Sequence, residues 1–213
     1  IFKGDATKSF VVMFCNIWNC LHPEKRIDIS KYINYSNLLT DGFVQPFCDD
    51  PLDNRNSAEG LYRSIISGAQ KYVHIISPYL IVDNNMLREL TVAAKSGIDI
   101  KIITPSIPDK WYVHPVTQYY YEELLEAGVE IFEYTPGFIH SKIFVSDDSV
   151  ATVGTVNMDY RSFYLHFECG AWICKSPAVR DIENHFNEIL NDSKKIILSE
   201  WRRRPISTKI KQS

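Results

Sequence analysis

The feature that most constrains the fold is a regular alternation of helix-like and strand-like segments between residues 57 and 134. Residues with helical apolar spacing occur at about 57–70, 84–96 and 116–127. Short apolar segments typical of strands lie at 72–77, 98–104 and 129–134, and glycines close the second and third helices. Strands that alternate with helices of this length form crossover units on a mostly parallel sheet covered by helices.

The next part of the chain predicts antiparallel pairing. Segments 139–146 (IHSKIFVS) and 149–154 (SVATVG) are separated by only an acidic turn, and strands joined this closely can only be antiparallel. A further strand is predicted at 165–173 and a closing helix at 176–190. The predicted fold class is therefore α/β, with a mixed β-sheet flanked by helices.

The first 54 residues show a different pattern. Asp5 is a candidate helix N-cap, and Pro23 ends a run of apolar residues at helical spacing, which are Phe10, Phe14, Ile17 and Trp18. Residues 22–54 are rich in Asp, Asn and Pro, which predicts a long connection with little regular structure. Because such a connection usually has a function or joins two units, we expect residues 1–54 to be a linking segment and residues 55–213 to form one domain.

The charge of the chain is slightly acidic and unevenly distributed. A net charge of -3 over 213 residues argues against the sequence-independent binding that strongly basic nucleic-acid-binding proteins use. The tail is nevertheless basic, through Lys194, Lys195, Arg202, Arg203, Arg204, Lys209 and Lys211. Such a density favours either contact with an anionic membrane surface or simply a solvated tail.

Cysteine usage and hydrophobicity limit the class of protein further. Five cysteines occur without a C-x-x-C spacing, so neither a zinc site nor a complete disulfide framework is indicated, and a reducing compartment fits best. The sequence has no signal peptide and no run of 18 or more apolar residues, which predicts a chain that neither spans a membrane nor is exported. Because it begins at Ile1, we expect a fragment of a longer protein or a processed form.

Residues 140–157 (HSKIFVSDDSVATVGTVN) place several polar residues on the predicted hairpin. Because successive side chains of a strand point to opposite faces, His140 and Lys142 are expected to project from the same face. A turn centred on the acidic pair places Gly154 opposite Lys142, to within about one residue of register, and returns Asn157 to the neighbourhood of His140. The absent side chain of Gly154 is expected to leave room beside them.

This combination predicts a site for an oxyanion. Lysine supplies a permanent positive charge, asparagine supplies an amide N–H donor, and histidine can be a nucleophile or a proton donor near neutral pH. A phosphodiester fits better than a carboxylate, because its charge repels nucleophiles and must be neutralised before attack. Asp147 is expected to be a structural turn and capping residue, since five residues of extended strand place it roughly 16 Å from Lys142.

Each of these residues alone would indicate little, because a lone His or Lys at a strand end is more often a surface residue and Asp-Asp-Ser is a common turn. The five positions together, H-x-K-x4-D-x6-G-x2-N, have a chance of random occurrence in a chain of this length on the order of one in ten thousand. We therefore favour the functional interpretation.

The same residues resemble the signature of the phospholipase D superfamily, H-x-K-x4-D-x6-G-[ST]-x-N, with Thr155 in the Ser/Thr position. Within that superfamily, residues 136–173 resemble the C-terminal half of bacterial cardiolipin synthases, as do the segments SPYLIVDNNML, YYYEELLEAGVEIFEYTPGF and GDATKSFVVMFCNIWN. The similarity covers nearly the whole chain and is densest from Tyr119 to Ile173. It implies a phospholipase D-like half of an enzyme.

The resemblance implies a phosphatidyltransferase that moves phosphatidyl from one phosphatidylglycerol to the hydroxyl of another and releases glycerol. Two motifs face each other in this superfamily: one histidine forms a phosphohistidine, while the other protonates the leaving alcohol and deprotonates the incoming one. Only one motif occurs here. The implied protein is a soluble C-terminal piece of a bacterial membrane enzyme, inactive alone.

Its implied partners are anionic phospholipids, a membrane surface and the missing N-terminal half, and not nucleic acid. No cofactor or metal is implied, because lysine neutralises the phosphate charge.

Carried over position by position, the resemblance assigns roles within the hairpin. His140 becomes a nucleophile or general acid/base, and Lys142 and Asn157 become phosphate ligands beside Gly154. Asp147 completes the motif and is counted with its catalytic residues, although its predicted position favours a structural role.

Glu168, His114 and His74 are the remaining candidates. Glu168 fills the place of a family carboxylate that orients a catalytic histidine, and a surface salt bridge is the alternative. His114 lies in a predicted loop after the strand at 98–104, where it would either line a lipid pocket or, as we favour, be a satisfied loop histidine. His74 is expected in the core, and no signal attaches to His22, His166 and His185.

Two other functions are compatible with the sequence. Some superfamily members have one motif per chain and act on DNA as homodimeric nucleases, which the mildly acidic charge disfavours. A non-catalytic module would use the same residues only to hold phosphate headgroups.

Overall fold

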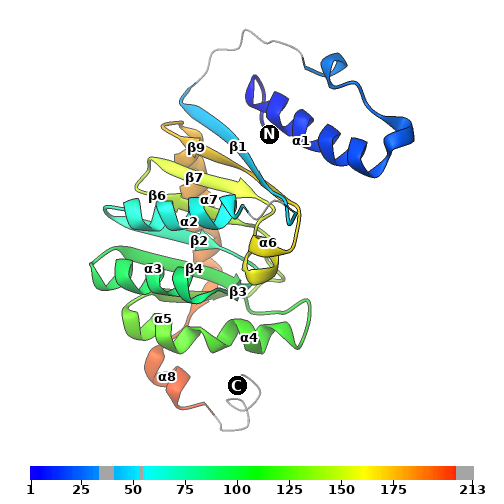
Figure 1. The fold of residues 1–213 in the computed structure, drawn as a ribbon. Coiled ribbons are helices and arrows are strands. Elements are labelled where there is room, and N and C mark those ends of the chain that lie inside the picture. The colour runs from blue at the N-terminus through cyan, green and yellow to red at the C-terminus, as the bar shows by residue number, and fades with distance from the viewer. Residues whose placement is uncertain (34–40, 53–54, 205–213) are drawn as a thin grey trace.

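The computed structural model describes residues 1–33, 41–52 and 55–204, and within them the centre of the molecule is an eight-stranded mixed sheet (Figure 1). Its strands are β1 (Phe43–Asp49), β2 (Tyr72–Ile76), β4 (Asp99–Pro105), β5 (Glu130–Tyr134), β6 (Ile143–Ser146), β7 (Val150–Gly154), β9 (Glu168–Cys174) and β10 (Ser193–Lys195). Their spatial order is β1-β9-β7-β6-β2-β4-β5-β10. A separate ladder pairs β3 (Leu80–Ile81) with β8 (Met158–Asp159).

The alternating part of the sequence forms the predicted parallel strands β2, β4 and β5. Helix α3 (Asn84–Lys95) connects the first two, and it begins where the Asp83 carboxylate accepts the Met86 N–H at 2.8 Å. The single helix predicted at 116–127 is instead two, α4 (Val113–Tyr119) and α5 (Tyr121–Ala127). Tyr121, the first residue of α5, is completely buried, whereas Tyr119 at the end of α4 is exposed.

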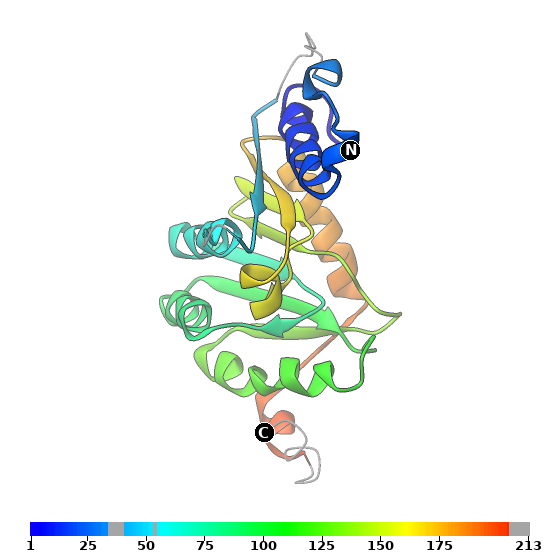
Figure 2. The same ribbon diagram turned by 45° about the vertical axis from the view of Figure 1, so that its right-hand side comes forward.

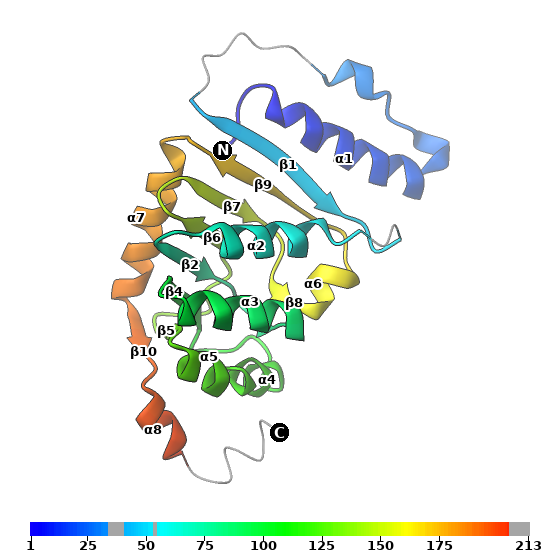
Figure 3. The same ribbon diagram turned by 60° about the vertical axis from the view of Figure 1, so that its left-hand side comes forward.

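Helices cover both faces of the sheet, which Figure 2 and Figure 3 show from two sides. Helix α2 (Ser57–Gly68) packs with α3 and α5 on one face, and α7 (Ala178–Asn191) packs on the other. Along β2, Val73 and Ile75 belong to the core on the α2 side, whereas Ile76 belongs to the core on the α7 side. This two-sided burial explains why the strand is largely apolar, with His74 as its one buried polar residue. The predicted α/β class with a mixed sheet is confirmed.

The predicted hairpin is confirmed, including its register. Strands β6 and β7 pair antiparallel, with Ile143 opposite Val153 and Ser146 opposite Val150, so pairing is symmetric about Asp148. Asp147 and Asp148 have φ values of 55° and 53°, a left-handed pair typical of tight hairpin turns. Strand β6 is shorter than the predicted 139–146, and the two motif residues before it lie in an irregular segment.

The N-terminal region contains one expected helix and one unexpected strand. Helix α1 (Ala6–Leu21) begins after Asp5 as predicted, and short 3-10 turns follow at Pro23–Lys25 and Ile29–Lys31. The expectation of little regular structure across residues 22–54 is wrong at β1, which pairs with β9 over seven residue pairs. Pro46 interrupts the strand pattern, and an edge strand tolerates it because its missing N–H can face away from the sheet. Residues 34–40 and 53–54 lie outside the described part.

The C-terminal region folds further than the sequence indicated. After α7, β10 adds to the sheet beside β5, and α8 (Leu198–Arg202) follows. Lys195 pairs with Glu130, and Arg202 pairs with Glu122 and Glu126, so these tail cations contact the fold itself. Lys209 and Lys211 lie outside the described residues. Within the described residues, no helix is long and apolar enough to cross a membrane.

Candidate active site at the carboxyl edge of the sheet

His140 and Lys142 lie at the carboxyl edge of the parallel strands. Ile143, the first residue of β6, pairs with Ile76, the last residue of β2, so the residues just before β6 are held at that edge. Open α/β sheets bind their ligands at this edge. His140, Lys142 and Gly154 together line one cavity of about 520 Å³, which Asp181 and His185 of α7 also line.

The ammonium group of Lys142 is buried and only partly compensated. The side chain is 8% exposed, and its Nζ donates one hydrogen bond to the backbone carbonyl oxygen of His140 at 2.6 Å. Burial lowers the pKa of Lys142, and the negative charges of Glu168 and Asp159 oppose this. No carboxylate of the described residues forms an ion pair with it. A buried cation without a direct counter-ion is favourable for binding an anion.

The imidazole of His140 is accessible and has no polar partner for its ring among the described residues. Its ring centroid lies 5.6 Å from that of Phe138. Loss of contact with water lowers the pKa of His140, the positive charge of Lys142 lowers it further, and Asp109 opposes both. The Asp109 carboxylate accepts a hydrogen bond from the Tyr79 hydroxyl at 2.7 Å. His140 is therefore biased toward the neutral form, which can attack phosphorus or accept a proton.

Gly154 is a glycine for a different reason from the predicted one. A Cβ at this position would lie 2.5 Å from the carbonyl oxygen of Cys169 and 2.6 Å from the Cα of Gly170. The backbone of β9 fills the space that we expected to be open for a ligand. The absent side chain permits close approach of β7 and β9, and only the backbone of Gly154 faces the cavity.

Asn157 lines a second, neighbouring cavity of about 320 Å³ rather than the one that contains His140. Its Nδ2 donates to the hydroxyl of Ser162 at 3.0 Å, and its buried Oδ1 has no partner among the described residues. A half-turn of the amide would give Oδ1 the Ser162 hydroxyl as donor and free the NH₂ group. Asn157 thus has one unused hydrogen-bonding group at this edge.

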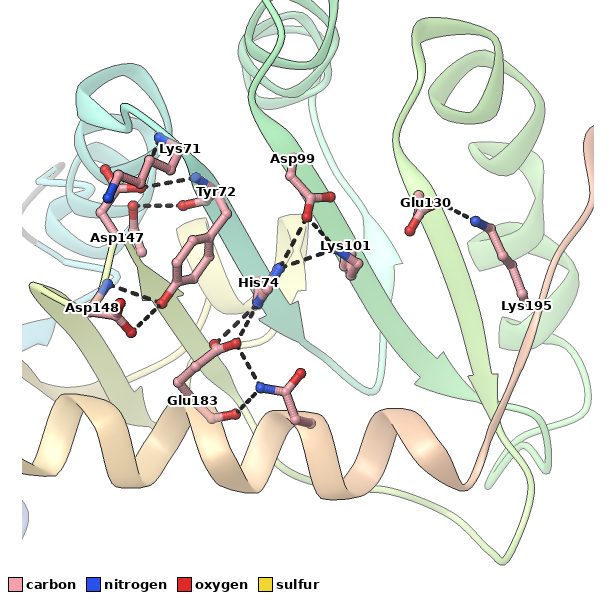
Figure 4. A network of polar contacts seen from close by, with 12 residues as sticks. Lys71, Tyr72, His74, Asp99, Lys101, Glu130, Asp147, Asp148, Glu183 and Lys195 are labelled. Carbon is pink, nitrogen blue, oxygen red and sulfur yellow. Dashed lines mark hydrogen bonds and ion pairs between the residues drawn. The ribbon is translucent and has the colours of Figure 1, made fainter.

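Asp147 lies at the opposite end of β6, where its carboxylate is fully used (Figure 4). It accepts backbone N–H groups from Gln70 at 2.7 Å and from Lys71 and Tyr72 at 2.9 Å. Among the described residues, no contact joins it to His140 or Lys142. These bonds tie the hairpin turn to the start of β2, which supports a structural role.

Glu168 is buried, and the salt bridge considered as its alternative would have the exposed His166 as partner and would need that ring to be protonated. Its carboxylate accepts the Thr155 hydroxyl and lies 3.7 Å from Nδ1 of His166. Within the described residues it does not contact His140, and its effect on the motif is the charge that it contributes near Lys142. Its ability to orient another histidine stays a prediction.

His114 and His74 both have partners in the fold. His114 lies in the first turn of α4 rather than in a loop, and its Nε2 accepts from Gln118 at 2.8 Å. Burial lowers its pKa, and Glu133 opposes this. His74 is confirmed as a core residue: its Nδ1 lies 3.0 Å from Glu183 of α7, between strand and helix (Figure 4).

Several residues near the site were not identified from the sequence, namely Asp109, Lys110, Arg161 and His166. The first two come from the loop after β4, and the others come from α6 (Tyr160–Tyr164) and the segment after it. Arg161 and His166 lie a few residues beyond the motif, but no sequence pattern marked any of the four as a site residue. Among the described residues, no group of three or more His, Cys, Asp or Glu side chains could hold a metal ion.

Comparisons with known proteins agree on the family and on the fold. The family described as "Cardiolipin synthase, PLD-like domain" matches residues 62–190. An uncharacterized protein of Streptococcus mutans is 40% identical over 210 residues, which cover 98% of this chain and 45% of that protein. The cardiolipin synthase of Alkalihalophilus pseudofirmus is 36% identical over 213 residues, covering 99% of this chain and 42% of the relative. The chain therefore spans less than half the length of these relatives.

Solved structures support the fold alone, because their sequence identity is low. Nuc of Salmonella typhimurium, a phospholipase D family member, superposes with a TM-score of 0.62 at 17% identity, covering 72% of this chain and 97% of that one. The phosphatidylserine synthase of Haemophilus influenzae superposes with a TM-score of 0.60 at 17% identity, covering 72% of this chain and 40% of that one.

Proposed function

Because the chain belongs to the cardiolipin synthase family with a phospholipase D-like domain, we propose that it supplies one half-site of a phosphatidyltransferase. The complete enzyme would transfer phosphatidyl from one phosphatidylglycerol to a hydroxyl of another. The observation that carries this proposal is that one cavity is lined both by His140, an accessible histidine whose pKa is lowered, and by Lys142, a buried lysine without an ion-pair partner among the described residues. The second half-site would come from the part of the relatives that this chain does not cover.

The reaction would proceed in two displacements at phosphorus. In the first, an imidazole nitrogen attacks phosphorus and a phosphorus–nitrogen bond forms. The bond from phosphorus to the oxygen of the headgroup glycerol breaks, and glycerol leaves as the opposing histidine protonates that oxygen. In the second, the hydroxyl of another phosphatidylglycerol loses its proton to that opposing histidine and attacks phosphorus, which breaks the phosphorus–nitrogen bond. His140 would fill one of these two roles.

The remaining motif residues would act by charge and position. Lys142 would bind a non-bridging phosphate oxygen, and the backbone of Gly154 would form part of the same wall. Asn157, with its amide turned, would donate to the phosphate from the neighbouring cavity. Glu168 would accept a hydrogen bond from the histidine that the second half-site brings to this edge. Asp147 would hold the hairpin without touching the lipid.

We also propose that the complete protein acts at the membrane, where its substrates are. Large apolar side chains are exposed on the loop after β4 and around α6, and they include Ile107, Trp111, Tyr112, Tyr160, Leu165 and Phe167. Aromatic side chains of this kind favour the boundary between water and lipid.

The direct test is reconstitution of the two half-sites. The chain would be assayed for phosphatidyl transfer alone and after co-expression with the segment encoded upstream of it, with phosphohistidine detected by ³¹P NMR. We expect transfer only in the combination, and no transfer with His140→Ala. His22→Ala is the matched control, because His22 lies outside both cavities.

Unchanged transfer and unchanged headgroup binding by His140→Ala would overturn the catalytic role and favour a binding module. Metal-independent cleavage of DNA by a dimer of the chain would favour a nuclease.

A further inference from the structure

The second cavity at the carboxyl edge contains cations that the motif chemistry does not use. It lies beside the β3–β8 ladder, and its charged lining residues are Lys110, Asp159 and Arg161. The Asp159 carboxylate is already a helix cap, since it accepts the Ser162 N–H at 2.6 Å. The residues that line the cavity thus carry one net positive charge, and the Asp109 carboxylate lies behind the lining Tyr79.

Contacts among side chains orient the guanidinium of Arg161. Its Nε donates to Nε2 of His166 at 2.9 Å, which requires that nitrogen to be unprotonated. The proton of His166 is then on Nδ1, which lies 3.7 Å from Glu168. That distance is too long for a hydrogen bond, so the bond to His166 is what orients the arginine.

Neither cation of this cavity is neutralised within the fold. Over residues 1–33, 41–52 and 55–204, no carboxylate pairs with Arg161 or Lys110. The terminal N–H groups of Arg161 therefore remain available as a planar fork, the geometry that binds two oxygens of one phosphate.

Shared lining residues connect this cavity to His140. Tyr79 and Val113 also line a small hollow whose wall includes Asp109 and Phe138. The negative charge of Asp109 acts on His140, and the ring of Phe138 lies beside the ring of His140. The second cavity is thus linked to His140 through Tyr79, Asp109 and Phe138.

We propose that this second cavity binds the phosphodiester of the acceptor lipid, the phosphate that does not react. The proposal rests on the proposed function and deepens it: two anionic lipids must be held at once, and Lys142 can neutralise only one of them. Arg161 and Lys110 would bind the acceptor phosphate. Its glycerol hydroxyl would extend past Asn157 toward the phosphohistidine.

The binding test uses glycerophosphoglycerol, the water-soluble headgroup of phosphatidylglycerol, with inorganic phosphate and glycerol as comparison ligands. Amide resonances of the chain would be followed by NMR, separating those near Arg161 and His166 from those near His140. We expect two independent binding events. Arg161→Gln should weaken the event at the second cavity about tenfold or more and spare the first, because it removes a charged, two-pronged donor from the phosphate. Lys142→Met should do the reverse, and Arg88→Gln on α3 is the control.

The outcomes separate this proposal from the proposed function. No titration of resonances near Arg161, or equal weakening by Arg88→Gln, would overturn the second site while leaving the half-site intact. Stronger binding of inorganic phosphate than of the headgroup would also overturn it, because the site would then be one for free phosphate.

A kinetic test addresses the acceptor role directly in the reconstituted enzyme. Water can replace the acceptor lipid as the group that attacks the phosphohistidine. Because water carries no phosphate, this hydrolysis does not need the second cavity. Arg161→Gln should therefore lower transfer to phosphatidylglycerol about tenfold while phosphatidyl hydrolysis continues at a similar rate. Equal loss of both reactions would contradict an acceptor site, and loss of both in the unmodified enzyme would instead contradict the proposed function.

Discussion

The two ends of the β6–β7 hairpin carry polar groups of the same motif but treat them in opposite ways. At the turn, the Asp147 carboxylate accepts three backbone N–H groups. At the other end, the Lys142 ammonium has a single backbone oxygen as partner, and the ring of His140 has no polar partner within the described residues. One end is satisfied by the protein, whereas the other leaves hydrogen-bonding capacity and charge for a ligand. A motif of fixed spacing thus combines a structural anchor with a reactive pair.

The largest expected effect is on activity at the reactive end. His140→Ala should reduce phosphatidyl transfer by the reconstituted enzyme on the order of a thousandfold or more, because the group that attacks or transfers the proton is removed. The free energy of unfolding should change by no more than about 0.5 kcal/mol, since the side chain is exposed. Transfer assays and urea unfolding measure the two quantities. A large loss of stability in His140→Ala would show that the reactive end of the hairpin is structural as well, which would contradict the difference between the two ends.

The next effect is on stability at the turn end. Asp147→Ala should lower the free energy of unfolding by about 2–3 kcal/mol, because three backbone donors lose a charged acceptor. Asp148→Ala is the matched control, since it has the same left-handed backbone but, among the described residues, only the Tyr72 hydroxyl as donor to its carboxylate. It should cost about 1 kcal/mol. Equal losses in urea unfolding would show that backbone conformation, and not the carboxylate, makes Asp147 important.

Substitution of Gly154 tests whether the reactive end of the hairpin depends on the close packing of β7 against β9. Gly154→Ala should destabilise the protein by about 1–3 kcal/mol, because the added Cβ meets the backbone of β9. Gly60→Ala is the control: no atom lies within 4 Å of its added Cβ, and alanine in a helix should raise stability by roughly 0.4–1 kcal/mol. Thermal unfolding of both variants gives the comparison. A neutral Gly154→Ala would contradict the close approach of β7 and β9.

The smallest expected effect is a change in the pKa of His140, which measures how strongly Lys142 acts on it. The pKa of His140 should lie below the ordinary histidine value of about 6.5, chiefly because the ring is partly removed from water. Lys142→Met should raise this pKa by removing a like charge, and Asp109→Asn should lower it by removing an opposite one. NMR titration of the ring protons measures each value. The acid limb of the transfer activity should accordingly lie below pH 6.5 if His140 is the nucleophile.

Much of the candidate site could be predicted from local pattern. The register about Asp148 followed from the spacing of the hairpin, and the structure has it. The anchoring of Asp147 was foreseen only as a turn role, because its three donors come from residues more than 70 positions earlier. The close packing behind Gly154 depends on β9, which no spacing within the motif could reveal.

The sequence by itself determined the class of the fold, the hairpin and the chemistry that His140 and Lys142 offer, because periods of 2 and 3.6 residues and tight turns are local properties. Tertiary structure alone decided that β1 joins the sheet edge, that Asn157 lines a separate cavity, and that Lys110 and Arg161 line that same cavity. These arrangements depend on segments distant in the chain, which come together only when the strands pair and the helices bury their apolar faces.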